Sequence, residues 1–110
     1  MIFNKEGNTT IVFQENISSQ TFLQNLKNAY ETIKHDHLII NLFSFDSLNA
    51  NDVLEYLEVS NAHRESKKSF IIVTKKVSYD QVPDEICIAP TIQEAKDIIE
   101  MEEIERDLEL

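Results

Sequence analysis

The chain is poor in cysteine and glycine, with one of each in 110 residues. A single cysteine, Cys87, excludes an intrachain disulfide and favours a reducing compartment. A single glycine, Gly7, excludes a glycine-rich phosphate-binding loop. No apolar run approaches the roughly 20 residues that a membrane-spanning helix needs. We therefore expect a cytoplasmic protein without a membrane segment.

Basic residues are also scarce, with 10 Lys and Arg against 20 Asp and Glu, which gives a net charge of −10. Such a surface repels a phosphate backbone, so nucleic acid is not an expected partner. The hydrophobic fraction of 42% is sufficient for one core, and the length suits one domain. Half of the basic residues lie between Arg64 and Lys76. A solvated turn explains them better than a docking patch for an acidic partner.

The amino-terminal half predicts a hairpin followed by a helix and a strand. The β-branched and apolar runs Met1–Lys5 and Thr9–Phe13 flank Gly7-Asn8, and glycine accepts the positive φ of a tight turn. Ser18 or Ser19 then caps a helix that ends near Lys34. The apolar stripe of this helix comprises Phe22, Leu26, Ala29, Tyr30 and Ile33.

The central segment LIINLFSFDSLNANDVLEYL, from Leu38 to Leu57, is the most informative stretch. Leu38–Leu42 predicts a strand that is buried on both faces, and a polar loop follows it. Asn49 is the expected cap of a second helix, which runs to about Arg64. Its expected buried positions are Ala50, Val53, Leu54 and Leu57. The corner after such a strand is where α/β proteins usually meet their ligands.

Phe43 and Phe45 flank this loop. Alternation along a strand places both on one face, and core packing is a better explanation for them than a patch that faces a partner.

The remaining sequence completes an α/β fold. Ser69–Val73 and Ile86–Ile88 predict two more strands, and Thr91 with Glu94 forms a capping box for the last helix. The order is β-β-α-β-α-β-β-α, which indicates a mixed sheet of an amino-terminal hairpin plus parallel strands, covered by helices. Residues 1–100 form the domain, and residues 101–110 form an acidic helix extension or tail. Ile104 and Leu108 would there form a small apolar seam, so we expect a monomer or a weak homodimer.

This element order, the segment LIINLFSFDSLNANDVLEYL and the ending IAPTIQEAKDII resemble a STAS domain, the fold of bacterial anti-sigma-factor antagonists. The resemblance implies a non-enzymatic regulatory module that binds a protein, such as an anti-sigma factor or a kinase-like regulator. The implied contact surface is the loop after the central strand with the helix that follows. The residues expected in it are Ser44, Asp46, Ser47, Asn49, Asn51, Asp52 and Glu55.

The regulatory serine of this family is not matched here. In well-known STAS domains a kinase phosphorylates a loop serine and thereby turns binding off. A gap-free match places Ala50 at that position, and alanine has no hydroxyl group. The resemblance therefore implies constitutive binding, or modification at Ser47 instead. The connection from Thr74 to Glu85 is also shorter than the family usually has, so a helix that helps to dock partners is missing.

An alternative function rests on His35-Asp36-His37. Two alternate histidines beside an acid resemble part of a metal motif of metallo-β-lactamase-fold nucleases, which would imply an accessory subunit or a small metal-dependent hydrolase or ribonuclease-type protein. Zinc needs three or four converging ligands, and His63 is the only further histidine. We therefore expect no metal, no cofactor and no catalytic residue.

Overall fold

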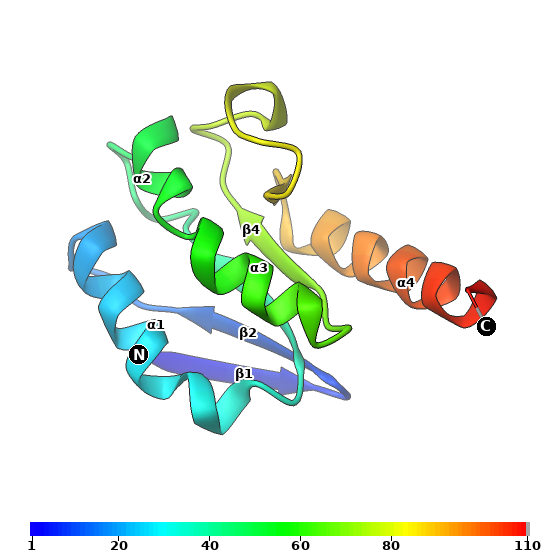
Figure 1. The fold of residues 1–110 in the computed structure, drawn as a ribbon. Helices are drawn as coiled ribbons and strands as arrows, with labels where there is room; N and C mark the ends of the chain where they lie inside the picture. Colours follow the sequence, from blue (N-terminus) through cyan, green and yellow to red (C-terminus); the bar gives the residue numbers. More distant parts are fainter. Residues whose placement is uncertain (110) are drawn as a thin grey trace.

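The fold is a mixed five-stranded β-sheet with helices on both faces, described by a computed structural model for residues 1–109 (Figure 1). Leu110, the last residue of the predicted extension, lies outside this range. The strands are β1 (Ile2–Glu6), β2 (Thr9–Phe13), β3 (His37–Asn41), β4 (Phe70–Val73) and β5 (Cys87–Ala89). The helices are α1 (Ser19–Ile33), α2 (Ala50–Leu54), α3 (Leu57–Glu65), the 3₁₀-helix η1 (Tyr79–Gln81) and α4 (Ile92–Leu108).

The strands lie side by side in the order in which they occur in the chain. β1 pairs antiparallel with β2, and β2 to β5 are parallel. Gly7 has a φ of 62° in the turn between β1 and β2, which is the conformation that its position in the sequence predicts. The predicted α/β class, the hairpin and the parallel strands are confirmed.

Two apolar cores lie on opposite faces of the sheet. Leu38 and Ile40 of β3 face α1, α2 and α3, where Phe22 is completely buried. Ile39 faces α4, where it packs with Ala95 and Ile99. Because β3 is buried on both faces, its sequence is an apolar run and does not alternate with polar residues. Each such side chain contributes about 1.5–3 kcal/mol by its burial.

The predicted second helix is two helices, α2 and α3, separated by a break at Glu55 and Tyr56. Tyr56 is completely buried, and its hydroxyl donates to the carbonyl oxygen of Ser19 at 3.2 Å. Val53, Ser60 and His63 are buried on the same side of this segment as Tyr56. Leu54, which was expected in the buried stripe, lies off that side and is 42% exposed, so that prediction is wrong.

The carboxyl-terminal helix α4 is continuous from Ile92 to Leu108. Thr91 caps it, because the Glu94 backbone N–H donates to the Thr91 hydroxyl at 3.1 Å. The short connection between β4 and β5 contains the single-turn helix η1. Among residues 1–109, no helix combines the length and the apolar character that crossing a membrane requires.

Candidate functional site

The loop between β3 and α2 lies at the carboxyl edge of the parallel strands, beside the amino terminus of α1. Leu42 and Leu48 are buried at its two ends. Phe45 packs edge-on against Phe22 with 5.7 Å between the ring centroids. The Phe45 backbone N–H also donates to the carbonyl oxygen of Leu42 at 3.1 Å. These contacts anchor the loop to the core.

The beginning of α2 is fixed by a reciprocal pair of hydrogen bonds. The Asp52 backbone N–H donates to Asn49 Oδ1 at 3.0 Å, and the Asn49 backbone N–H donates to Asp52 Oδ2 at 3.1 Å. The predicted cap at Asn49 is thus confirmed. Gln20 Nε2 of α1 reaches Asp52 Oδ1 at 3.5 Å. The carboxylate of Asp52 therefore stabilises the beginning of α2 and links it to α1.

A cavity of about 590 Å³ lies between this loop and the amino terminus of α1. Ser44, Asp46, Ser47 and Asp52, all expected from the sequence, line it together with residues 16–20. The other expected residues, Asn49, Asn51 and Glu55, are exposed on and around α2 but do not line the cavity. The structure thus brings part of the predicted set together around one hollow.

Two exposed apolar side chains next to the loop were not predicted. Phe43 is 54% exposed, and Lys75 Nζ lies 5.6 Å from its ring centroid. Strand alternation no longer applies at Phe43, because β3 ends at Asn41. The prediction of core packing is therefore wrong for Phe43, whereas Phe45 does pack on the core. Leu54 at the end of α2 is the second exposed side chain, because the buried side of this segment runs through Val53 and Tyr56 instead.

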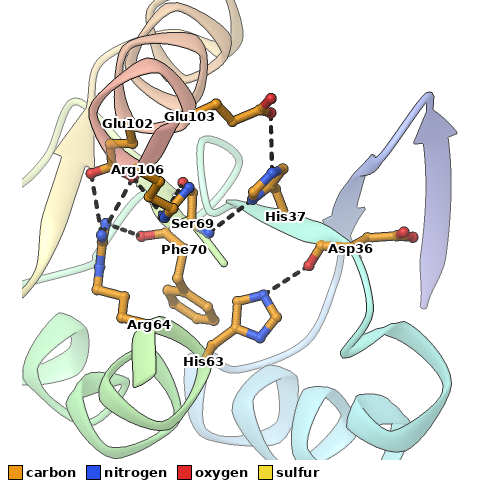
Figure 2. A network of polar contacts seen from close by, with 9 residues as sticks. All are labelled: Asp36, His37, His63, Arg64, Ser69, Phe70, Glu102, Glu103 and Arg106. Atoms are coloured by element: carbon orange, nitrogen blue, oxygen red, sulfur yellow. Dashed lines mark hydrogen bonds and ion pairs between the residues drawn. The ribbon is translucent and has the colours of Figure 1, made fainter. Parts of the chain in front are cut away.

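A second polar cluster lies at the opposite edge of the sheet, where β3 and β4 begin (Figure 2). The Ser69 backbone N–H donates to His37 Nδ1 at 2.9 Å, so this nitrogen carries no proton. His37 Nε2 then donates to Glu103 Oε1 of α4 at 3.1 Å. Burial lowers the pKa of His37 more than Glu103 raises it. His37 is consequently a neutral link between β4 and α4.

His63 of α3 is completely buried in the same region. Its Nε2 donates to the carbonyl oxygen of Asp36 at 2.8 Å, and its Nδ1 accepts from the Tyr30 hydroxyl at 2.7 Å. In the neutral form both ring nitrogens thus have a hydrogen-bond partner. Burial lowers the pKa of His63 to about 4, and it raises the pKa of Tyr30, which keeps the phenol protonated as a donor.

Arg64, Glu102 and Arg106 complete the cluster in Figure 2. Arg64 donates to both carboxylate oxygens of Glu102, at 3.2 and 3.4 Å, and to the Phe70 carbonyl oxygen at 3.1 Å. Arg106 donates to the Ser69 hydroxyl at 2.9 Å. The cluster thereby ties α3, β4 and the second half of α4 together, and it explains how an acidic helix stays on the domain.

The histidines considered as metal ligands do not converge. His35 is exposed, whereas His37 is buried and engaged with Ser69 and Glu103. The Asp36 carboxylate accepts from Lys5 and Thr10. Within residues 1–109, no three His, Cys, Asp or Glu side chains are grouped so as to hold a metal ion. Cys87 is half-buried, and desolvation raises the pKa of its thiol, which disfavours the reactive thiolate.

Comparison with known proteins adds no family to this description. No family model matches the sequence, and no curated protein matches it significantly.

Proposed function

We propose that this protein is a non-enzymatic regulatory module that binds a partner protein through the β3–α2 loop and α2, as its resemblance to STAS domains suggests. The observation that carries the proposal is an ordered loop at the carboxyl edge of the strands that exposes apolar side chains among polar ones. Loops that a rigid scaffold positions in this way are common binding sites. The resemblance suggests an anti-sigma factor or a kinase-like regulator as the partner.

The surface has the composition of a small protein interface. Phe43 and Leu54 are 54% and 42% exposed, and a partner that covers them gains about 25 cal/mol for each Å² of apolar area removed from water. Asn51 and Glu55 lie on exposed positions next to Leu54, where they can form a polar rim. The hydrogen bonds of Asn49 and Phe45 already order the loop, so binding loses little conformational entropy there.

The partner is bound without a phosphoserine switch at position 50. Ala50 is the first residue of α2, directly after the Asn49 cap, and its methyl group cannot accept phosphate. Ser47 is exposed on the loop, next to Asp46. Phosphate on Ser47 would add nearly two negative charges beside Asp46 and Asp52, which would weaken binding to a partner that approaches these acids.

The proposed contact area is concentrated on the loop and α2. The segment between β4 and β5 holds only the three-residue η1, where the STAS resemblance implies a longer docking helix. Tyr79 of η1 is 76% exposed and does not replace such a helix. A substitution on α2 should therefore affect affinity strongly.

The test begins with the partner captured from the source cell and identified by mass spectrometry, and its affinity is then measured by calorimetry. Asn51→Arg places a long charged side chain on the exposed face of α2 and should weaken binding by about tenfold or more. Asn28→Arg is the matched control, because Asn28 is an exposed asparagine on α1. The control should bind as the wild type does.

Ser47→Asp distinguishes constitutive binding from a phosphorylation switch at Ser47. Constitutive binding predicts an affinity close to that of the wild type, and a switch at Ser47 predicts a clear loss. If Asn51→Arg is folded and binds as tightly as Asn28→Arg, the interface lies elsewhere and the proposal fails.

A further inference from the structure

The outward side of α4 carries a line of large apolar side chains. Met101, Ile104 and Leu108 are 61%, 53% and 80% exposed. Their spacing of three and then four residues places them on one side of the helix. Ala95 and Ile99, which pack against the sheet, lie on the opposite side. The last turns of α4, drawn in red in Figure 1, lie away from α1 and α2.

Acidic side chains border the stripe on both sides. In heptad terms Met101 and Leu108 are a positions and Ile104 is a d position, so Glu100, Glu105 and Asp107 occupy e and g positions. All three are exposed, and none takes part in an ion pair among the residues that the structure describes. The free charge of α4 is thus on the outward side, next to the apolar stripe.

The inward side of the same helix holds it in place. Glu102 pairs with Arg64 at 3.2 Å, Glu103 pairs with His37 at 3.1 Å, and Arg106 donates to Ser69 at 2.9 Å. These contacts are on the turns that carry the stripe. The stripe is therefore presented on a helix that is already formed, and a partner does not have to order it.

We propose that this stripe docks a basic amphipathic helix of a partner protein, with apolar residues against Met101, Ile104 and Leu108 and with Lys or Arg at the flanking positions. Charge complementarity carries the choice of partner, because e and g residues decide which helices pair. Glu100, Glu105 and Asp107 would each face a cation.

A second copy of this chain fits the stripe poorly. In a parallel pair, g positions face e positions, which brings Glu100 next to Glu105 of the other copy. An antiparallel pair places g against g and e against e, which again opposes acids with acids. Each chain also carries a net charge of −10. An anionic lipid surface is repelled for the same reason.

This surface is separate from the loop at the carboxyl edge of the strands, because the bonded residues Glu103 and Arg106 place the second half of α4 at the amino-terminal ends of β3 and β4. The inference therefore does not depend on the proposed function.

Two synthetic peptides test the proposal with the full chain. Both have leucine at a and d positions of an amphipathic helix, and they carry either lysine or glutamate at e and g. Fluorescence anisotropy at about 0.15 M salt should show binding of the lysine peptide and at least roughly tenfold weaker binding of the glutamate peptide. A double variant, Ile104→Ser with Leu108→Ser, should lower the affinity for the lysine peptide by about tenfold. The matched control Ile2→Ser, an isoleucine of β1 that is as exposed as Ile104, should not change the binding of this peptide.

Reversal of the acidic charges beside the stripe is the second test. Glu100→Lys, Glu105→Lys and Asp107→Lys together should invert the preference, so that the glutamate peptide binds more tightly. Circular dichroism checks that each variant keeps its helices. The proposal is overturned if the serine variant binds the lysine peptide as the wild type does, or if the reversed variant still prefers lysine. It is also overturned if sedimentation shows a dimer that the serine variant loses, or if the wild type binds anionic phospholipid vesicles through the stripe.

Discussion

His63 should make the protein lose stability at mildly acidic pH. It is completely buried, its Nε2 donates to the Asp36 carbonyl oxygen at 2.8 Å, and its Nδ1 accepts from Tyr30 at 2.7 Å. Protonation would add a charge in this buried site and would require the Tyr30 hydroxyl to turn from donor to acceptor. The pKa is accordingly lowered by burial from 6.5 to about 4. The positive charges of Lys68 and Arg64 contribute to this lower pKa, and the hydrogen bond to the Asp36 carbonyl oxygen opposes it.

The direction and the size of this stability change follow from proton linkage. Between pH 6.5 and 4 the unfolded chain binds a proton at His63 and the folded chain does not, so the free energy of unfolding falls as the pH falls through this window. One pH unit of pKa difference corresponds to about 1.4 kcal/mol, so the complete loss is about 3 kcal/mol. Most of it, about 2 kcal/mol, should occur between pH 7 and 5.

Urea unfolding of the wild type and of His63→Gln, measured at steps from pH 7 to pH 5, isolates this contribution. Glutamine keeps a donor and an acceptor but does not titrate, and carboxylates contribute equally to both proteins. The difference between the two stabilities should therefore shift by about 2 kcal/mol in favour of His63→Gln as the pH falls. Parallel pH profiles would refute the reasoning and would mean that His63 titrates normally in the folded protein.

Three further predictions concern the core, the loop and α4. Ile40→Asp should lower the free energy of unfolding by several kcal/mol, because Ile40 is completely buried; a loss below about 1 kcal/mol in urea unfolding would contradict its place in the core. Asn49→Ala should cost about 1 kcal/mol through loss of the α2 cap, and an unchanged urea midpoint would contradict a stabilising capping box. Deleting residues 102–110 should cost about 2 kcal/mol, because Arg64 and Ser69 lose charged partners; an unchanged thermal midpoint would show that these contacts add nothing.

The elements of the fold could be predicted where local sequence decides them. Gly7 supplies the positive φ of the hairpin, Ser18 and Thr91 cap their helices, and Leu38–Ile40 is apolar because both of its faces are covered. The break between α2 and α3 was not predictable in the same way. At this break Tyr56 is buried, and its hydroxyl donates to the carbonyl oxygen of Ser19, 37 residues earlier in the chain. A periodic pattern contains no information about such a distant contact.

The candidate site could be predicted only in part for the same reason. The loop residues Ser44 and Ser47 follow directly from the strand–loop–helix pattern. Residues 16–20 line the same cavity only because α1 packs beside the loop. The cluster combines His37 of β3 with His63 and Arg64 of α3 and with Glu102 of α4. No local spacing indicates that these side chains meet.

Amide hydrogen exchange of the full chain, free and bound to its captured partner, tests the proposed interface most directly. The proposal predicts that bound partner slows exchange in residues 42–55, which include the loop and α2. Residues 24–33 of α1, which carry the control position Asn28, should exchange as they do in the free protein. Protection confined to α1 or to β1, with residues 42–55 unchanged, would contradict the account.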